Sequence, residues 1–330
     1  MNRLGQAACI DVPNSASISV LPSAKSAFRT LLLALVVSIL LCGCSGGRAS
    51  AASSPGAAGG GQASGAEFKP PADIVVVEVE KTGEMNIDIS QLSKGVVAAE
   101  ATNANRLKFQ VKKDDMAYNY DLPGDGTPTL YPLNMENGYY TFRIMQNTEG
   151  SNYIEIASVT ADVSLESEFD PFLVPNMYCN YTAKSSCVSK ARELTSSASN
   201  QGEAVRNVCE YLAANISYDT PKAEKLSTST GYVPDPDETL SSGKGICFDY
   251  SSLAAAMLRS LGFPTKIVTG YVSPGDLYHA WIMVYADGSW HSAVFSVDPK
   301  TWSRVDVTFA SSGSTAFTGD GASYTDRYVY

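Results

Sequence analysis

Residues 243–258 read GKGICFDYSSLAAAML, and this stretch predicts a helix that begins next to Cys247. Apolar residues follow at helical spacing, and the helix is expected to stop at Gly262, with Pro264 just after it. The N–H groups at a helix N-terminus favour a thiolate over a thiol, and they can donate hydrogen bonds to an oxyanion. A cysteine in this position is also typical of simple packing, so Cys247 needs a partner before it indicates chemistry.

The chain has only two histidines, His279 and His291, and this small number limits its chemistry. It excludes a metal site built from several imidazoles. His279 opens the apolar pattern HAWIMVY after a loop that contains Gly275 and Asp276, whereas His291 follows a tight turn. A general base must face its nucleophile, and the mouth of a sheet is a favourable place for that. We therefore expect His279 to be the base, with His291 as the substitute.

Three motifs in order give the chain a resemblance to the transglutaminase-like superfamily. They are GICFDYS at 245–251, GFPTKIVTGY at 262–271 and HAW at 279–281. The resemblance implies a papain-like fold and a catalytic triad whose members follow the chain order Cys, His, Asp. It implies that Cys247 is the nucleophile and that His279 is the base.

Two aspartates compete for the third place in this triad. Asp306 lies in WSRVDVTF, which is similar to a family form, and a strand pattern before it supplies the extra hairpin of some extracellular members. Asp298 begins DPKTW, where Pro299 and Lys300 favour a solvated turn. We therefore expect Asp306 to orient the imidazole, and Asp298 remains the alternative.

The resemblance implies a thiol acyl-transfer enzyme that acts on amide bonds of proteins or peptides through a thioester. The acceptor can be an amine, as in transglutaminases, or water, as in a cysteine peptidase or amidase, and the sequence leaves this choice open. A non-catalytic binding module that kept the fold is a further alternative. Animal transglutaminases use calcium, but no acidic cluster here matches a calcium loop, so we predict neither a cofactor nor a metal.

The length of 330 residues predicts two folded regions behind an N-terminal extension. In the first, IVVVEVE at 74–80 predicts a strand, and YYTFRI and NYIEIASV predict a hairpin. In the second, helical periodicity precedes four strand patterns joined by turns, which predicts an α+β region with an antiparallel meander. The predicted segments are a signal peptide at 1–43, a flexible Gly/Ser/Ala linker at 44–72, a mostly-β accessory domain at 73–168 and a transglutaminase-like catalytic domain at 169–330.

The N-terminal extension carries a positive flank followed by the apolar run Thr30–Leu41, which is typical of a signal peptide. The next residues, LCGC, resemble the lipobox of bacterial lipoproteins, and the small Gly43 before the cut implies that Cys44 carries the lipid. We expect a chain anchored to the extracytoplasmic face of the membrane, with protein or cell-wall peptide substrates. A net charge of −10 and the lack of a Lys/Arg cluster argue against a nucleic-acid partner.

Three other cysteines of the second region have structural explanations. Cys209 falls on the apolar face of a predicted helix, where a small buried side chain is expected. Cys179 and Cys187 flank a polar turn, and outside the cytoplasm they could form a disulfide or remain thiols.

Overall fold

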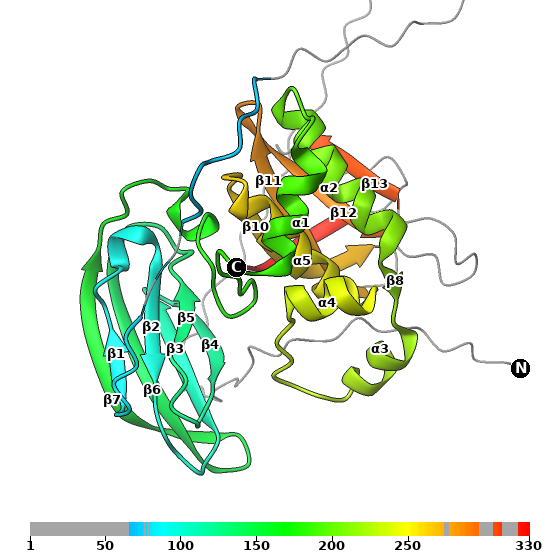
Figure 1. Ribbon diagram of the computed structural model, residues 1–330. Helices are drawn as coiled ribbons and strands as arrows, with labels where there is room; N and C mark the ends of the chain where they lie inside the picture. The colour runs from blue at the N-terminus through cyan, green and yellow to red at the C-terminus, as the bar shows by residue number, and fades with distance from the viewer. Residues whose placement is uncertain (1–65, 76, 78, 274–276, 297–305, 312–322) are drawn as a thin grey trace, which may run out of the picture. The chain divides into compact units, whose positions relative to one another are not determined.

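The computed structural model describes residues 66–330, except for positions 76, 78, 274–276, 297–305 and 312–322. The described residues form an α+β structure in which two antiparallel sheets precede a group of helices and a five-stranded antiparallel sheet (Figure 1). The predicted fold class is therefore confirmed. The predicted signal peptide, the lipidation site Cys44 and the alternative triad member Asp298 lie outside the described residues.

The first region contains two sheets, with the strand orders β1-β2-β5 and β4-β3-β6-β7. The predicted hairpin is formed by β6 and β7, in which Phe142 lies opposite Val159. Alternate side chains of β6, among them Tyr140, Phe142 and Ile144, are buried, as the period of a strand requires. The elements are β1 (Asn86–Asp88), η1 (Leu92–Lys94), β2 (Val96–Glu100), β3 (Leu107–Lys113), β4 (Met116–Leu122), β5 (Thr129–Pro132), β6 (Gly138–Glu149) and β7 (Asn152–Val163).

The strand predicted for IVVVEVE at 74–80 is wrong, because the described residues of this run have no regular secondary structure. The first strand of the sheet begins only at Asn86. β-branched residues favour an extended backbone, but a strand also needs a neighbour for its ladder hydrogen bonds. Composition alone cannot supply that neighbour.

The sheet of the second region has the order β13-β12-β11-β10-β14 and is antiparallel throughout. The predicted meander is β10 to β13, and β14 pairs with β10 on the other side. Its strands are β10 (Thr265–Ser273), β11 (Leu277–Ala286), β12 (Ser289–Ser296), β13 (Asp306–Ser311) and β14 (Ser323–Val329). The helices are η2 (Asp170–Phe172), α1 (Ser186–Thr195), α2 (Gln201–Asn215), α3 (Thr220–Leu226), α4 (Pro236–Ser242) and α5 (Cys247–Ser260).

Helix α5 lies at the centre of this region, and every residue of it is buried. It packs on β10 and β11 and against α1, α2 and α4. The small side chains Ala254, Ala255 and Ala256 allow close approach on all sides. The helix ends at Ser260, and Gly262 follows with a φ of 84°, a left-handed conformation that glycine adopts without strain. The stop predicted from sequence is thus confirmed.

The last turn of α5 is fixed by a buried guanidinium group. Arg259 is 1% exposed and donates to the carbonyl oxygens of Thr265 at 2.9 Å, Val174 at 2.8 Å and Tyr330 at 3.0 Å. A cation near a helix C-terminus also complements the helix dipole. Arg259 therefore connects the helix to Thr265 of β10 and to Tyr330, the residue that follows β14.

A series of aromatic rings connects the first region with the start of α5. The ring of Tyr118 on β4 lies 6.0 Å from that of Tyr330, and Tyr330 lies 4.7 Å from Tyr178. Tyr178 in turn packs 5.2 Å from Phe248, the residue after Cys247. Because these side chains belong to one buried cluster, the first turn of α5 has a rigid support.

The last residues of the expected linker contact the second region. The Ala66 N–H donates to Asp287 Oδ1 at 2.7 Å, and the Gln201 N–H donates to the Ala66 carbonyl at 2.9 Å. The ring of Phe68 stacks on Phe263 at 5.3 Å. Among the helices that the structure describes, none is long and apolar enough to cross a membrane.

Candidate active site

Cys247 and His279 line the same small cavity. Cys247 is the first residue of α5, and His279 lies near the start of β11. The cavity measures about 10 Å³, roughly the space of one water molecule, and Cys247 is 5% exposed. The sulfur of Cys247 therefore has little exposed surface in this structure. The remaining wall residues are Ile246, Phe248, Thr269, Tyr278 and Ala280.

The backbone before Cys247 is held by two short strands and by a helix cap. β8 (Ser217–Tyr218) pairs in parallel with β9 (Lys244–Gly245). Ile246 is the N-cap of α5 with an extended backbone, and its N–H donates to the Asp249 carboxylate at 2.8 Å. This bond is one half of a capping box, and it satisfies an N–H that the helix itself cannot. Cys247 is thereby presented on the first turn of a buried helix.

The structure places the two histidines at different ends of the β11–β12 hairpin. His279 pairs with Gly270 of β10, beside the cavity. His291 pairs with Val284, and its Nε2 lies 3.0 Å from Ser289 Oγ and 3.1 Å from the Ala286 carbonyl oxygen. His279 is the histidine that lies beside Cys247, whereas His291 is bonded to the turn at the far end.

The candidate third residue, Asp306, is the first residue of β13. It pairs with Ser296 of β12, while Ile282 of β11 pairs with Ala293 of β12. The pairing of β11 with β12 that the structure describes ends at Ile282 and Ala293, before it reaches His279. Asp306 and His279 therefore lie on two strands of one sheet that are separated by β12.

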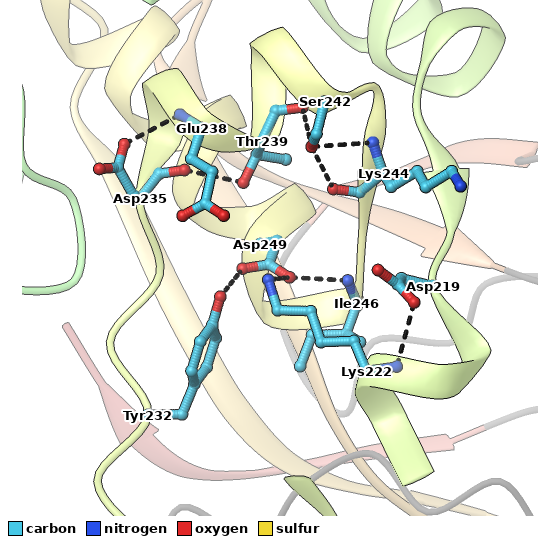
Figure 2. Close-up of polar contacts among 10 residues, drawn as sticks. All are labelled: Asp219, Lys222, Tyr232, Asp235, Glu238, Thr239, Ser242, Lys244, Ile246 and Asp249. Atoms are coloured by element: carbon cyan, nitrogen blue, oxygen red, sulfur yellow. Dashed lines mark hydrogen bonds and ion pairs between the residues drawn. The ribbon is translucent and has the colours of Figure 1, made fainter. Parts of the chain in front are cut away.

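A buried carboxylate lies under the same helix turn, and the sequence motif gave it no role. Asp249 is 0% exposed, and its Oδ2 lies 2.8 Å from the Lys222 ammonium of α3 (Figure 2). Its Oδ1 accepts a hydrogen bond of 2.5 Å from the Tyr232 hydroxyl. Burial, and then the Asp249 charge, raise the pKa of Tyr232 well above its ordinary value, so this phenol stays protonated and donates.

The other cysteines that the structure describes are buried and form no disulfide. Cys179 and Cys187 are therefore not bridged in this structure. Burial raises the pKa of Cys179 to about 11 and that of Cys209 to about 12. Burial and the nearby Asp237 carboxylate raise the pKa of Cys187 still further above its ordinary range. Thiols in such surroundings are poor nucleophiles, which leaves Cys247 as the candidate.

Residues 188–307 match the family model of the transglutaminase-like superfamily, so the C-terminal part of the chain is a transglutaminase-like domain. This match includes Cys247, His279, Asp298 and Asp306. This match agrees with the fold described above and with the family that the sequence motifs resemble.

Curated relatives are similar over a limited part of the chain. UPF0252 protein MJ1282 of Methanocaldococcus jannaschii is 29% identical over 94 residues, which cover 26% of this chain and 27% of that protein. Uncharacterized protein ML0607 of Mycobacterium leprae is 27% identical over 115 residues, which cover 32% and 37%. The chain thus spans well under half the length of these two relatives.

Two solved structures are similar to parts of this chain at low sequence identity. A crystal structure of a TGase is 22% identical, with 35% of this chain and 33% of that chain covered and a TM-score of 0.28. A candidate cysteine protease from Cytophaga hutchinsonii is 16% identical, with 72% and 87% covered and a TM-score of 0.34.

Proposed function

We propose that this protein is an extracytoplasmic thiol acyl-transfer enzyme that acts on amide bonds of proteins or peptides. The observation that carries the proposal is the cavity shared by Cys247 and His279, at the N-terminus of a buried helix in a transglutaminase-like domain. A nucleophile with a base within reach is the usual arrangement for covalent catalysis. The helix N-terminus adds N–H groups that favour the thiolate.

In the proposed reaction, His279 takes the proton of the Cys247 thiol and the sulfur attacks the amide carbonyl carbon. The π electrons of the carbonyl move to its oxygen, and N–H groups of the first turn of α5 donate to this oxyanion. The C–N bond then breaks, His279 returns the proton to the leaving nitrogen, and an acyl thioester remains. An amine or water gives a proton to His279 and attacks the thioester carbon, the C–S bond breaks, and His279 returns the proton to the sulfur.

The small cavity and the low exposure of Cys247 also fit a non-catalytic binding module, and the reactivity of the thiol distinguishes the two functions. We would treat the full chain with limiting iodoacetamide near neutral pH and locate the label by peptide mass spectrometry. An enzyme requires Cys247 to react faster than the same cysteine in the urea-unfolded chain, whose pKa is about 8.5. A slower reaction in the folded chain would favour the binding module. Incubation with a glutamine-containing protein and a fluorescent primary amine then distinguishes amine from water as the acceptor.

We assign the third position of the triad to Asp306, supported by its WSRVDVTF surroundings and its place on β13, in the same sheet as His279. An aspartate in this role holds the imidazole tautomer and stabilises the imidazolium. Asp306→Asn is expected to lower turnover by about 10³-fold, while the thermal stability changes little. Asp298→Asn is the matched control, and its turnover should stay within about twofold of the unmodified chain. If the large loss occurs only with Asp298→Asn, the role belongs to Asp298.

The proposal includes a location at the extracytoplasmic face of the membrane, which the N-terminal sequence supports. The LCGC motif would place a diacylglycerol on Cys44, and acyl chains contribute about 0.8 kcal/mol per buried methylene. Such an anchor would present the domain to surface proteins or cell-wall peptides. Mass spectrometry of the membrane fraction would detect the lipid on Cys44, and Cys44→Ser should release the chain from that fraction.

A further inference from the structure

Asp249, in the first turn of α5, forms an ion pair with Lys222 of α3 (Figure 2). Asp249 is the third residue of α5, and its side chain is 0% exposed, whereas the Lys222 side chain is 24% exposed. Each oxygen of the carboxylate has a partner: Lys222 and the Ile246 N–H at Oδ2, and the Tyr232 hydroxyl at Oδ1. The pair is thus built into the helix start rather than placed on the surface.

The lysine is itself held in place by the segment that precedes Cys247. Asp219 is the N-cap of α3 and accepts from the Lys222 N–H at 3.0 Å. The Asp219 N–H donates to the Gly245 carbonyl at 2.9 Å, two residues before the nucleophile. A Cβ at Gly245 would lie only 2.7 Å from Asp249 Cβ, so this position has no room for a side chain. Helix α3 and the segment before α5 are therefore joined by hydrogen bonds at closely packed backbone.

A buried ion pair contributes little to stability, because desolvation of two charges offsets their attraction. Its place here has a different consequence. An isolated carboxylate two residues from a thiol opposes the thiolate, and an isolated ammonium favours it. Together, their opposite effects on the sulfur largely offset one another.

We propose that Asp249 and Lys222 are positioning residues for Cys247, which fix the backbone at Ile246 and set the pH at which the thiol ionises. This inference rests on the proposed function, because it takes Cys247 as the nucleophile. Lys222 neutralises the carboxylate that the helix cap requires. The cap can therefore be strong without suppressing the thiolate.

Other titratable groups lie on α5 and on neighbouring elements of the second region, and all of them stay unchanged in the experiment below. A difference between variants therefore reports the ion pair. These groups are His279 and Tyr278 of β11, Asp219 of α3, Tyr232 before α4, Asp235, Asp237 and Glu238 of the α4 start, Lys244 of β9, Cys187 of α1, Cys209 of α2, Tyr271 of β10, His291 of β12, Asp306 of β13, and Tyr250 and Arg259 of α5.

The test measures the rate of Cys247 carboxymethylation by iodoacetamide against pH in the full chain, with the label located by peptide mass spectrometry. Asp249→Asn leaves Lys222 uncompensated, so the midpoint of the rate should fall by about one pH unit. Lys222→Gln leaves the carboxylate without its cation, while its hydrogen bonds from Tyr232 and Ile246 remain, so the midpoint should rise by about one unit. The double variant should return to within about 0.3 units of the unmodified chain.

Lys94→Gln is the matched control, because Lys94 forms an ion pair with Glu166 that is exposed on both sides, and it should leave the midpoint unchanged. Unfolding cannot imitate the expected result, since it would move every variant in one direction toward the ordinary thiol midpoint of about 8.5. Midpoints that stay equal, or that shift in the same direction in both single variants, would overturn the proposal. If Cys247 of the unmodified chain already titrates like an unfolded thiol, the proposed function fails first.

Discussion

Cys247→Ala is expected to lower the turnover of an amide substrate by about 10⁴-fold or more, because no other described thiol can form the thioester. The fold should remain, since the change removes one sulfur atom and leaves the hydrogen bond from the Ile246 N–H to Asp249 in place. The measurement is the initial rate of ammonia release or amine incorporation, with a thermal melting curve for each protein. Cys247→Ser is a second variant with nearly the same shape, and a similar loss is expected.

Cys209→Ala is the matched control for this prediction. Cys209 is buried on α2, with a pKa raised by burial to about 12, so it stays a thiol across the physiological range. Its removal should cost about 1 kcal/mol of stability, as for one buried methylene, and should leave turnover within about twofold. Activity that survives Cys247→Ala but not Cys209→Ala would show that the nucleophile was assigned wrongly.

The helix that carries Cys247 could be predicted because its signals are local. Apolar spacing along the chain defined its buried face, and Gly262 with Pro264 defined its end. The meander of β10 to β13 followed from strand patterns joined by short turns, such as Asp287 and Gly288. Each of these features depends on residues within a few positions of one another.

Features that depend on distant residues were missed. The ion pair joins Asp249 to Lys222, and no local pattern indicates that the lysine of one helix meets the third residue of another. The strand expected at 74–80 failed for the same reason, because its existence depends on a neighbour. The contacts of Ala66 and Phe68 could not be predicted from the sequence either, since a Gly/Ser/Ala-rich composition predicts only a flexible tether.

The candidate site could be predicted only in part from the sequence. The motifs singled out Cys247 and His279 separately, and the cavity now brings them together. The choice between Asp306 and Asp298 is still a prediction, because it depends on how the sheet edge after β12 is arranged. Paired substitution of the two aspartates is the direct route to an answer.

His279→Gln is expected to lower turnover by about 10⁴-fold, because glutamine can occupy a similar volume but cannot carry a proton between sulfur and nitrogen. The alkylation of Cys247 supplies a second measurement. In the His279→Gln variant its rate at neutral pH should fall, since the thiolate has no imidazolium beside it to stabilise it. Both rates are measured on the same preparation, next to a melting curve.

His291→Gln provides the control, as the chain offers only one other imidazole. His291 contacts Ser289 and the Ala286 carbonyl at the turn of the β11–β12 hairpin, away from the cavity. Its replacement should change stability by about 1 kcal/mol at most and leave both rates unchanged. Equal losses from the two substitutions would mean that the hairpin acts through its fold, whereas a loss confined to His279→Gln identifies the base. The contrast is sharp because the two residues lie on adjacent strands of one hairpin and differ in which end of it they occupy.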